Sequence, residues 1–235
     1  AMAEPSDTDG ATPAPRPPAA GSKAGEAYLV VPDEGPGPGV LGLHSWWGLG
    51  ESPRRVVEQL ADAGYTALAP DLSSGLVTDD PDEAQQALAE ADPNAVAALV
   101  LSSVAALRAR TAVPTDRIAV VGFSMGASWA MWLATRLPGS VSAVVAYYGT
   151  QNIDFDDLEA PVLGHFADED PLVTEDELTE MHARLLLSEK SVELHRYPGT
   201  SHWFAEEDRP AFHHPDAAAQ AWDRTLRFLA EHLRG

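Results

Sequence analysis

Residues 118–137 read IAVVGFSMGASWAMWLATRL: an apolar strand-like run, a tight turn around Ser124, and a helix-like run. The turn has the pattern Gly-X-Ser-X-Gly, which is typical of a nucleophile elbow, where a serine hydroxyl projects from a strained strand-to-helix turn. Glycines flank the serine because a side chain at either position would clash with neighbouring elements. The motif alone is weak evidence, but a strand before it and a helix after it strengthen it. We therefore predict that Ser124 is a nucleophile in an α/β fold.

A serine hydroxyl needs a base to take its proton, and the base needs a carboxylate that orients it; after an elbow these follow in the order acid, then histidine. Residues 160–167 form a strand-like run that ends at an acidic loop containing Asp170, and residues 192–197 form another that ends at a turn-rich loop containing His202. Ligand sites in open α/β sheets lie at the carboxyl ends of the strands. We therefore predict a catalytic triad of Ser124, Asp170 and His202.

Alternative readings exist for the acid and for a metal site. Asp168 is the second candidate acid, and an acidic residue of this loop could instead cap the helix expected near Thr174. Asp170 is favoured because the proline-containing stretch after it turns the chain into that helix with the carboxylate facing the site. His213 and His214 are adjacent but have no matching third ligand in the sequence, so we predict no metal site.

Composition limits the classes of partner. The chain has 235 residues, of which 45% are hydrophobic and 22% charged, as in ordinary globular proteins. Its formal net charge of −21 disfavours nucleic acid and anionic membranes as partners. Without cysteine it can form neither a disulfide nor a thiol nucleophile. No apolar run approaches the roughly 20 residues of a membrane span, and the N-terminus lacks the features of a secretory signal, so we expect a cytoplasmic protein.

The order of elements predicts the fold class. Residues 1–22 are rich in proline and alanine and are expected to be a disordered tail, with a single domain over residues 23–235. Strand-like runs at 28–31 and 40–43 are expected to form a hairpin at the sheet edge. Strands and helices then alternate, which predicts a three-layer α/β fold with a mostly parallel central sheet flanked by helices and no separate cap domain. The expected helices cover residues 54–63, 93–110, 125–137, 175–188 and 217–233, and the expected strands cover 66–69, 118–121, 141–147, 160–167 and 192–197.

One long irregular connection, residues 72–92, follows a strand end on the side where the site is expected. Two readings of it are about equally supported: a short lid that shapes the pocket, or a surface excursion that contains one helix at residues 82–90.

Several stretches resemble the dienelactone hydrolases, a compact branch of the α/β-hydrolase fold. The likeness runs from about residue 28 to the C-terminus, and it is carried by the elbow and by GLHSWWGL (42–49), LADAGYTALAPDL (60–72), GTSHWF (199–204) and AAAQAWDRTL (217–226). The resemblance implies the triad Ser124, Asp170 and His202, an oxyanion hole made by the backbone N–H groups of Met125 and Trp46, and no cofactor.

Three departures from the family pattern concern the chemistry and the substrate. The family's nucleophile is usually cysteine, where this chain has Ser124. Members that act on dienelactone have a glutamate where this chain has Ser45, and they hold the substrate carboxylate with arginines. Here no Lys or Arg stands between Arg55 and Arg108, and Glu206 occupies the position after the histidine loop. A buried anion needs paired donors, so we expect a neutral ester or lactone.

The pocket is expected to be apolar and lined by Ser45, Trp47, Phe123 and Trp203, although these aromatic residues could equally belong to the core. The predicted protein is thus a cofactor-independent serine hydrolase acting on a small neutral ester or lactone, and nothing in the sequence indicates an oligomeric state. Two alternatives use the same fold: a biosynthetic hydrolase or cyclase acting on a thioester or macrolactone, and a catalytically silent protein that binds a small ligand.

Overall fold

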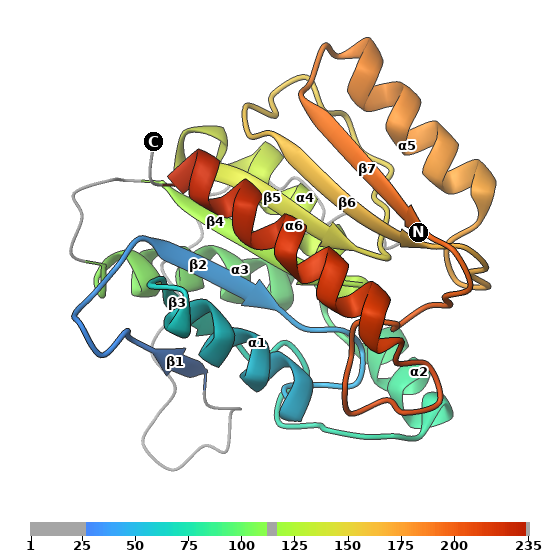
Figure 1. The fold of residues 1–235 in the computed structure, drawn as a ribbon, viewed down its shortest axis with the longest axis horizontal. Helices are drawn as coiled ribbons and strands as arrows, with labels where there is room; N and C mark the ends of the chain where they lie inside the picture. Colours follow the sequence, from blue (N-terminus) through green and yellow to red (C-terminus); the bar gives the residue numbers. More distant parts are fainter. Residues whose placement is uncertain (1–26, 112–116, 234–235) are drawn as a thin grey trace.

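The fold is built on one seven-stranded sheet (Figure 1). The computed structural model describes residues 27–111 and 117–233, so the tail predicted at residues 1–22 lies outside the described residues. Within the sheet the strand order is β1-β3-β2-β4-β5-β6-β7, and every pair is parallel except β1 with β3. The predicted mostly parallel sheet is confirmed. The strands are β1 (Tyr28–Val30), β2 (Gly39–Leu43), β3 (Thr66–Ala69), β4 (Ile118–Phe123), β5 (Val141–Tyr147), β6 (Val162–Ala167) and β7 (Val192–Tyr197).

The predicted hairpin of the first two strands is wrong. β1 pairs with β3 in antiparallel register, with Tyr28 opposite Ala69, and β2 lies between β3 and β4 and is parallel to both. Every residue of β2 is buried, whereas β1 is only partly buried. A continuous apolar run without polar alternation fits an interior strand covered on both faces. The chain therefore crosses over after β1 rather than turning back on it.

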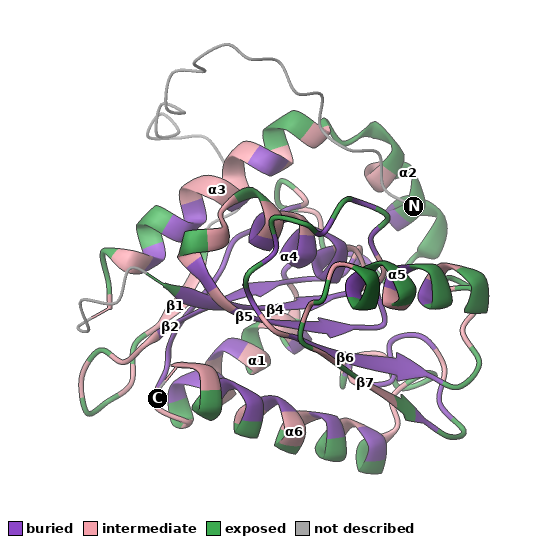
Figure 2. Ribbon diagram, turned by 90° about the horizontal axis from the view of Figure 1, so that it is seen from above, coloured by how far each residue is buried: buried purple, intermediate pink, exposed green. Residues whose placement is uncertain are grey.

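Helices cover both faces of the sheet in three layers (Figure 2). One face carries α3, α4 and α5, and the other carries α1 and α6. Among the helices of the described residues, none is long and apolar enough to cross a membrane. The helix expected at residues 82–90 is present as α2. The helices are α1 (Glu51–Asp62), α2 (Pro81–Glu90), α3 (Pro93–Arg108), α4 (Met125–Arg136), α5 (Glu175–Leu187) and α6 (Pro215–Leu233), with a short 3₁₀ turn at Pro138–Ser140.

The core has two halves, one on each face of the sheet, because side chains alternate along each strand. In β4, Ile118 and Val120 belong to the half under α3 and α4, while Ala119 and Val121 belong to the half under α1 and α6. All four are at most 1% exposed. Burying a large aliphatic side chain contributes about 1.5–3 kcal/mol. The sheet is thus a rigid base that fixes the positions of its strand ends.

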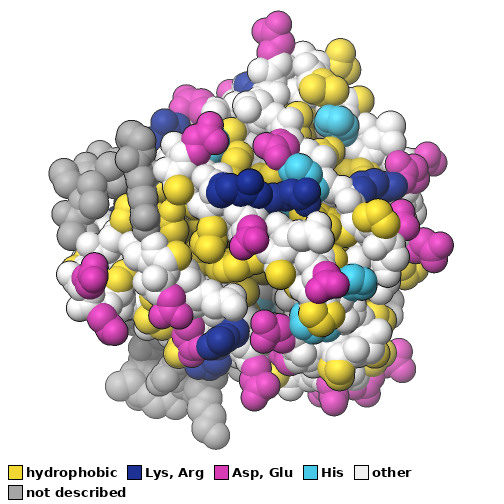
Figure 3. Space-filling model, in the orientation of Figure 1, with side chains coloured by type: hydrophobic (Ala, Val, Ile, Leu, Met, Phe, Trp, Pro, Cys, Tyr) yellow, Lys and Arg dark blue, Asp and Glu magenta, His cyan; other side chains and the backbone are white. Residues whose placement is uncertain are grey.

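The surface carries the excess acidic charge in dispersed form. On the face shown in Figure 3, Asp and Glu side chains are scattered between apolar and neutral ones, and the few Lys and Arg side chains lie among them. Solvated single charges of this kind keep a protein soluble and disfavour anionic partners. On this face the charge marks no single binding patch.

Candidate active site

Ser124 lies at the turn between β4 and α4, in the elbow expected from the sequence. Its φ of +53° is in the region that L-residues rarely adopt, which costs about 1–3 kcal/mol and marks a position held by its surroundings. The flanking glycines are required by close contacts. A Cβ on Gly122 would lie 2.2 Å from the carbonyl oxygen of Gly126, and one on Gly126 would lie 2.1 Å from that of Leu43.

A continuous hydrogen-bond chain starts at the serine hydroxyl. Ser124 Oγ lies 2.7 Å from His202 Nε2, and His202 Nδ1 lies 2.7 Å from Asp170 Oδ2. The other carboxylate oxygen of Asp170 accepts the backbone N–H groups of Leu172 (2.8 Å) and Val173 (3.0 Å). The His202 and Asp170 side chains are 2% and 6% exposed. This arrangement lets Nδ1–H donate to the carboxylate while Nε2 accepts from the serine, as a general base requires.

The other candidate acid and the candidate metal ligands are placed elsewhere. Asp168 is exposed and accepts the N–H of Gly199 at 3.2 Å, away from His202. Helix α5 is capped by Thr174, which forms a reciprocal capping box with Glu177, so the acidic loop is not its cap. His214 Nδ1 accepts the N–H of Ala217 at the start of α6. In residues 27–111 and 117–233, no group of three or more histidine, aspartate or glutamate side chains could hold a metal ion.

Two backbone N–H groups beside Ser124 have no acceptor within the described part of the chain. They belong to Met125, the first residue of α4, and to Trp46, in the loop after β2. The close approach of Gly126 to the carbonyls of Leu43 and His44 brings this loop against the elbow. Free amides at a helix N-terminus, helped by the helix dipole, attract developing negative charge. The pair is therefore suited to hold an oxyanion, as the family resemblance implied.

A hollow of about 210 Å³ opens at Ser124 and His202. Sequence reasoning predicted Ser124 and His202, which line this hollow, but missed much of its wall. The overlooked positions include Tyr148, Gly149 and Thr150, which follow β5, and Leu88 of α2. The signal for the first three was available, because β5 is the parallel neighbour of β4 and its end must lie at the same edge of the sheet.

The residues predicted to line the pocket are mostly core residues, and the structure corrects that expectation. Trp47, Phe123 and Trp203 are at most 7% exposed and do not line the hollow. The ring of Trp203 packs against Trp47 at 5.0 Å and against Trp46 at 5.7 Å between centroids. Of this aromatic cluster, Trp46 alone lines the hollow. The stacked rings fill the space behind the loop that follows β2 and leave no room there for substrate.

Glu206 is a buried carboxyl that connects two neighbours of the site. It accepts hydrogen bonds from Ser45 Oγ (2.9 Å) and Tyr148 Oη (3.0 Å). Burial raises the pKa of Glu206 to about 7, although both hydroxyl donors act to lower it. The Tyr148 ring in turn packs against His202, 4.9 Å between centroids. Glu206 therefore lies beneath the site and not in the hollow, and Ser45 is its partner instead of a pocket residue.

Comparison with known proteins gives consistent results across the described fold. The model of the Dienelactone hydrolase family matches residues 26–233. Protein usf of Aquifex pyrophilus is 31% identical over 216 residues, which cover 88% of this chain and 93% of that protein. A Bradyrhizobium protein named "Probable 2-oxo-3-(5-oxofuran-2-ylidene)propanoate lactonase" is 33% identical, covering 89% of this chain and 90% of that protein. A crystal structure from Klebsiella pneumoniae subsp. pneumoniae MGH 78578, named as a dienelactone hydrolase, superposes with a TM-score of 0.77 at 28% identity, covering 87% of this chain and 92% of that one.

Proposed function

The chain belongs to the dienelactone hydrolase family of carboxylic ester hydrolases, and we propose that it is a cofactor-independent serine hydrolase that cleaves a neutral ester or lactone through an acyl-enzyme. The observation that carries this proposal is the unbroken hydrogen-bond chain from Ser124 through His202 to Asp170. A serine hydroxyl becomes a useful nucleophile only when such a base takes its proton.

In the first half-reaction, Ser124 Oγ attacks the carbonyl carbon while His202 Nε2 takes the hydroxyl proton. The carbonyl oxygen becomes an oxyanion and accepts the N–H groups of Met125 and Trp46. Asp170 stabilises the imidazolium through Nδ1–H and fixes its tautomer. The tetrahedral intermediate then collapses: the bond to the leaving oxygen breaks, and His202 gives that oxygen the proton.

In the second half-reaction, a water molecule takes the place of the leaving group. His202 Nε2 accepts a proton from the water as its oxygen attacks the acyl carbon, and the same two N–H groups hold the second oxyanion. Collapse breaks the ester bond to Ser124, and the proton returns to Oγ. The acid leaves and the serine is restored.

A neutral substrate is supported by the charges around the hollow. The residues that line the hollow include no Lys or Arg, but they do include Glu177. A carboxylate held there would have no cationic partner, and an unpaired buried charge costs several kcal/mol. The name of the Bradyrhizobium relative specifies a lactone that carries a carboxylate. We propose that the present chain differs from that relative in preferring uncharged esters and lactones.

The test is intact-mass spectrometry after treatment with a fluorophosphonate. Wild-type protein and a Ser142→Ala control, altered at the opposite end of the sheet in β5, should each gain one adduct, and Ser124→Ala should gain none. Peptide mapping should locate the adduct on Ser124. An adduct that persists in Ser124→Ala, or no adduct in the wild type together with no hydrolysis of p-nitrophenyl acetate, would overturn the proposal.

A further inference from the structure

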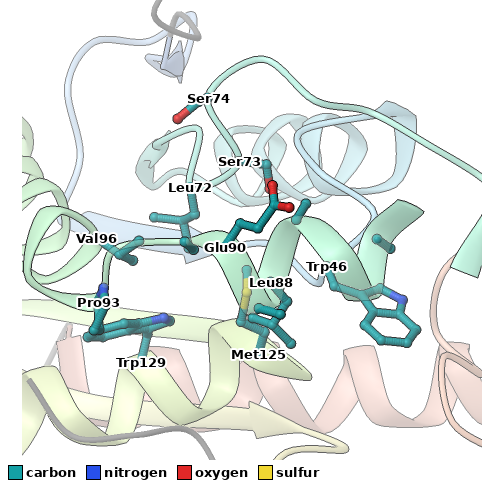
Figure 4. A pocket seen from close by; sticks show the side chains of 14 residues that line it. Trp46, Leu72, Ser73, Ser74, Leu88, Glu90, Pro93, Val96, Met125 and Trp129 are labelled. Atoms are coloured by element: carbon teal, nitrogen blue, oxygen red, sulfur yellow. The ribbon is translucent and has the colours of Figure 1, made fainter. Parts of the chain in front are cut away.

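A second and larger cavity lies under α2. Its volume is about 630 Å³, within the range of small-molecule sites. Helix α2 contributes one face to it: Ala84 is buried, and Ala87 and Leu88 are half-buried, at the spacing of neighbours on one side of a helix. The opposite wall is made by Met125 and Trp129 of α4. We call this cavity the α2 chamber (Figure 4).

The α2 chamber joins the hollow at the serine. Trp46, Leu88 and Met125 line both spaces. In Figure 4 the side chains of Leu88 and Met125 lie between those of Trp46 and Trp129. Met125 and Trp46 are also the residues whose N–H groups are suited to the oxyanion. A substituent of a carbonyl held at Ser124 can therefore extend directly past them into the chamber.

The position of the base decides which half of the ester enters. The leaving oxygen must lie within hydrogen-bond reach of His202 Nε2 to receive its proton. His202, Leu172 and Val173 line the hollow, and none of the three lines the α2 chamber. The alcohol part of the ester therefore stays on the side of His202, and the acyl part points towards the α2 chamber.

On the basis of the proposed function, we propose that the α2 chamber is the acyl-binding subsite and that it takes a large, uncharged, apolar acyl group such as a medium-chain or aromatic acyl. The walls have the matching chemistry: Leu72, Leu88, Val96, Met125 and Trp129 present apolar surface, and Glu90 is the one charged residue among those lining the chamber. Each methylene of the acyl group that is buried against these walls stabilises the complex further. A carboxylate at the end of the acyl chain would meet Glu90 and no cation.

The test compares kcat/KM for p-nitrophenyl acetate and p-nitrophenyl octanoate, the second kept below its solubility limit. Wild-type protein should prefer the octanoate by at least about tenfold, since a few well-packed methylenes suffice for such a ratio. Ala87→Phe places a ring in the chamber and should lower kcat/KM for the octanoate by about 30-fold or more, with the acetate changed by less than about threefold. Gln85→Phe is the matched control on the exposed face of the same helix, and it should keep the wild-type ratio.

A second comparison needs no variant. The p-nitrophenyl monoester of suberic acid has the length of the octanoate and ends in a carboxylate, and the wild type should hydrolyse it at least about 100-fold less efficiently than the octanoate. Equal rates for these two substrates would overturn the proposed subsite. The proposed subsite would also be overturned if kcat/KM for the octanoate were lower than that for the acetate in the wild type. The same conclusion would follow if Ala87→Phe left the ratio of the two kcat/KM values unchanged. In each of these cases hydrolysis of the acetate would leave the proposed serine hydrolase standing, although equal rates for the octanoate and the suberate monoester would also overturn its proposed preference for neutral substrates. Loss of both activities in the wild type would overturn both proposals.

Discussion

His202 and His165 are both buried and held on both ring nitrogens, and they differ in one partner. His202 lies between Ser124 Oγ and the carboxylate of Asp170. His165, in the middle of β6, lies between Tyr197 Oη (2.8 Å) and Thr225 Oγ1 (3.0 Å). Each therefore has a hydroxyl neighbour, but only His202 has a negative charge beside it.

The difference shows what turns a buried imidazole into a base. Burial, with nearby His195 and Arg224, holds the pKa of His165 well below its usual value, so this ring stays neutral. Its hydroxyl partners can exchange hydrogen bonds with it but cannot balance a positive charge. The carboxylate of Asp170 can, and that single partner distinguishes His202 from His165.

Removing the charge of Asp170 without changing its shape should have the largest effect on activity. Asp170→Asn should lower kcat for p-nitrophenyl acetate by about 10⁴-fold, because the amide favours the wrong tautomer of His202 and cannot stabilise the imidazolium. Steady-state kinetics checks this, with the melting temperature showing that the variant is folded.

Asp168→Asn is the matched control for that change. Asp168 is in the same loop, is exposed, and accepts only the N–H of Gly199 through a carboxylate oxygen that asparagine also provides. Its kcat should stay within about twofold of wild type, as for most surface changes. A large loss in Asp168→Asn, with Asp170→Asn close to wild type, would move the acid to Asp168.

Glu206 offers a sharper test of the comparison, because it is a buried acid that forms no salt bridge within the part of the chain that the structure describes. Its pKa in the folded protein is about 7, against an ordinary value of 4.5. Between pH 4.5 and pH 7 the folded state therefore keeps a proton that the unfolded state has lost. The stability that depends on this proton is fully present below pH 4.5 and is lost as the pH rises towards 7. At about 1.4 kcal/mol per pH unit, this loss reaches about 3 kcal/mol.

Glu206→Gln replaces the protonated acid with a neutral amide of nearly the same shape. The free energy of unfolding of Glu206→Gln minus that of wild type should be about 2–3 kcal/mol larger at pH 8 than at pH 5. Urea unfolding at the two values measures the change. Glu207→Gln, at an exposed neighbouring position, should follow the wild type. A constant difference between Glu206→Gln and wild type across this range would show that Glu206 is ionised in the folded protein.

These cases also show which parts of the molecule its sequence could predict. The elbow, Asp170 and His202 follow from local patterns at strand ends, and parallel topology brings strand ends together. The sequence mispredicts the place of β1 because its partner strand is far along the chain, with Tyr28 opposite Ala69, 41 positions away. The role of Ser45 was missed for the same reason, since its partner Glu206 is 161 positions away. Contacts at that separation leave no local pattern.

The smallest effect is expected at His165, where the comparison predicts structure without catalysis. His165→Phe replaces the imidazole with a somewhat larger apolar ring and removes two hydrogen bonds. Tyr197 Oη still accepts from Arg224, and Thr225 Oγ1 still pairs with Tyr147. The two lost hydrogen bonds should lower the free energy of unfolding at pH 8 by about 1–2 kcal/mol, and kcat should stay within about twofold of wild type.

The pH dependence of this variant should run opposite to that of Glu206→Gln. In wild type the folded pKa of His165 is depressed, so the stability it contributes is present above pH 6.5 and is lost as the pH falls below that value. Phenylalanine has no proton to gain, so the deficit of His165→Phe should shrink as the pH falls from 8 to 5. A deficit that grows on acidification in urea unfolding would show that His165 carries a proton in the folded protein. A fall in kcat as large as that of Asp170→Asn would show that His165 takes part in catalysis. Either result would mean that the absence of a neighbouring carboxylate is not what separates the two rings.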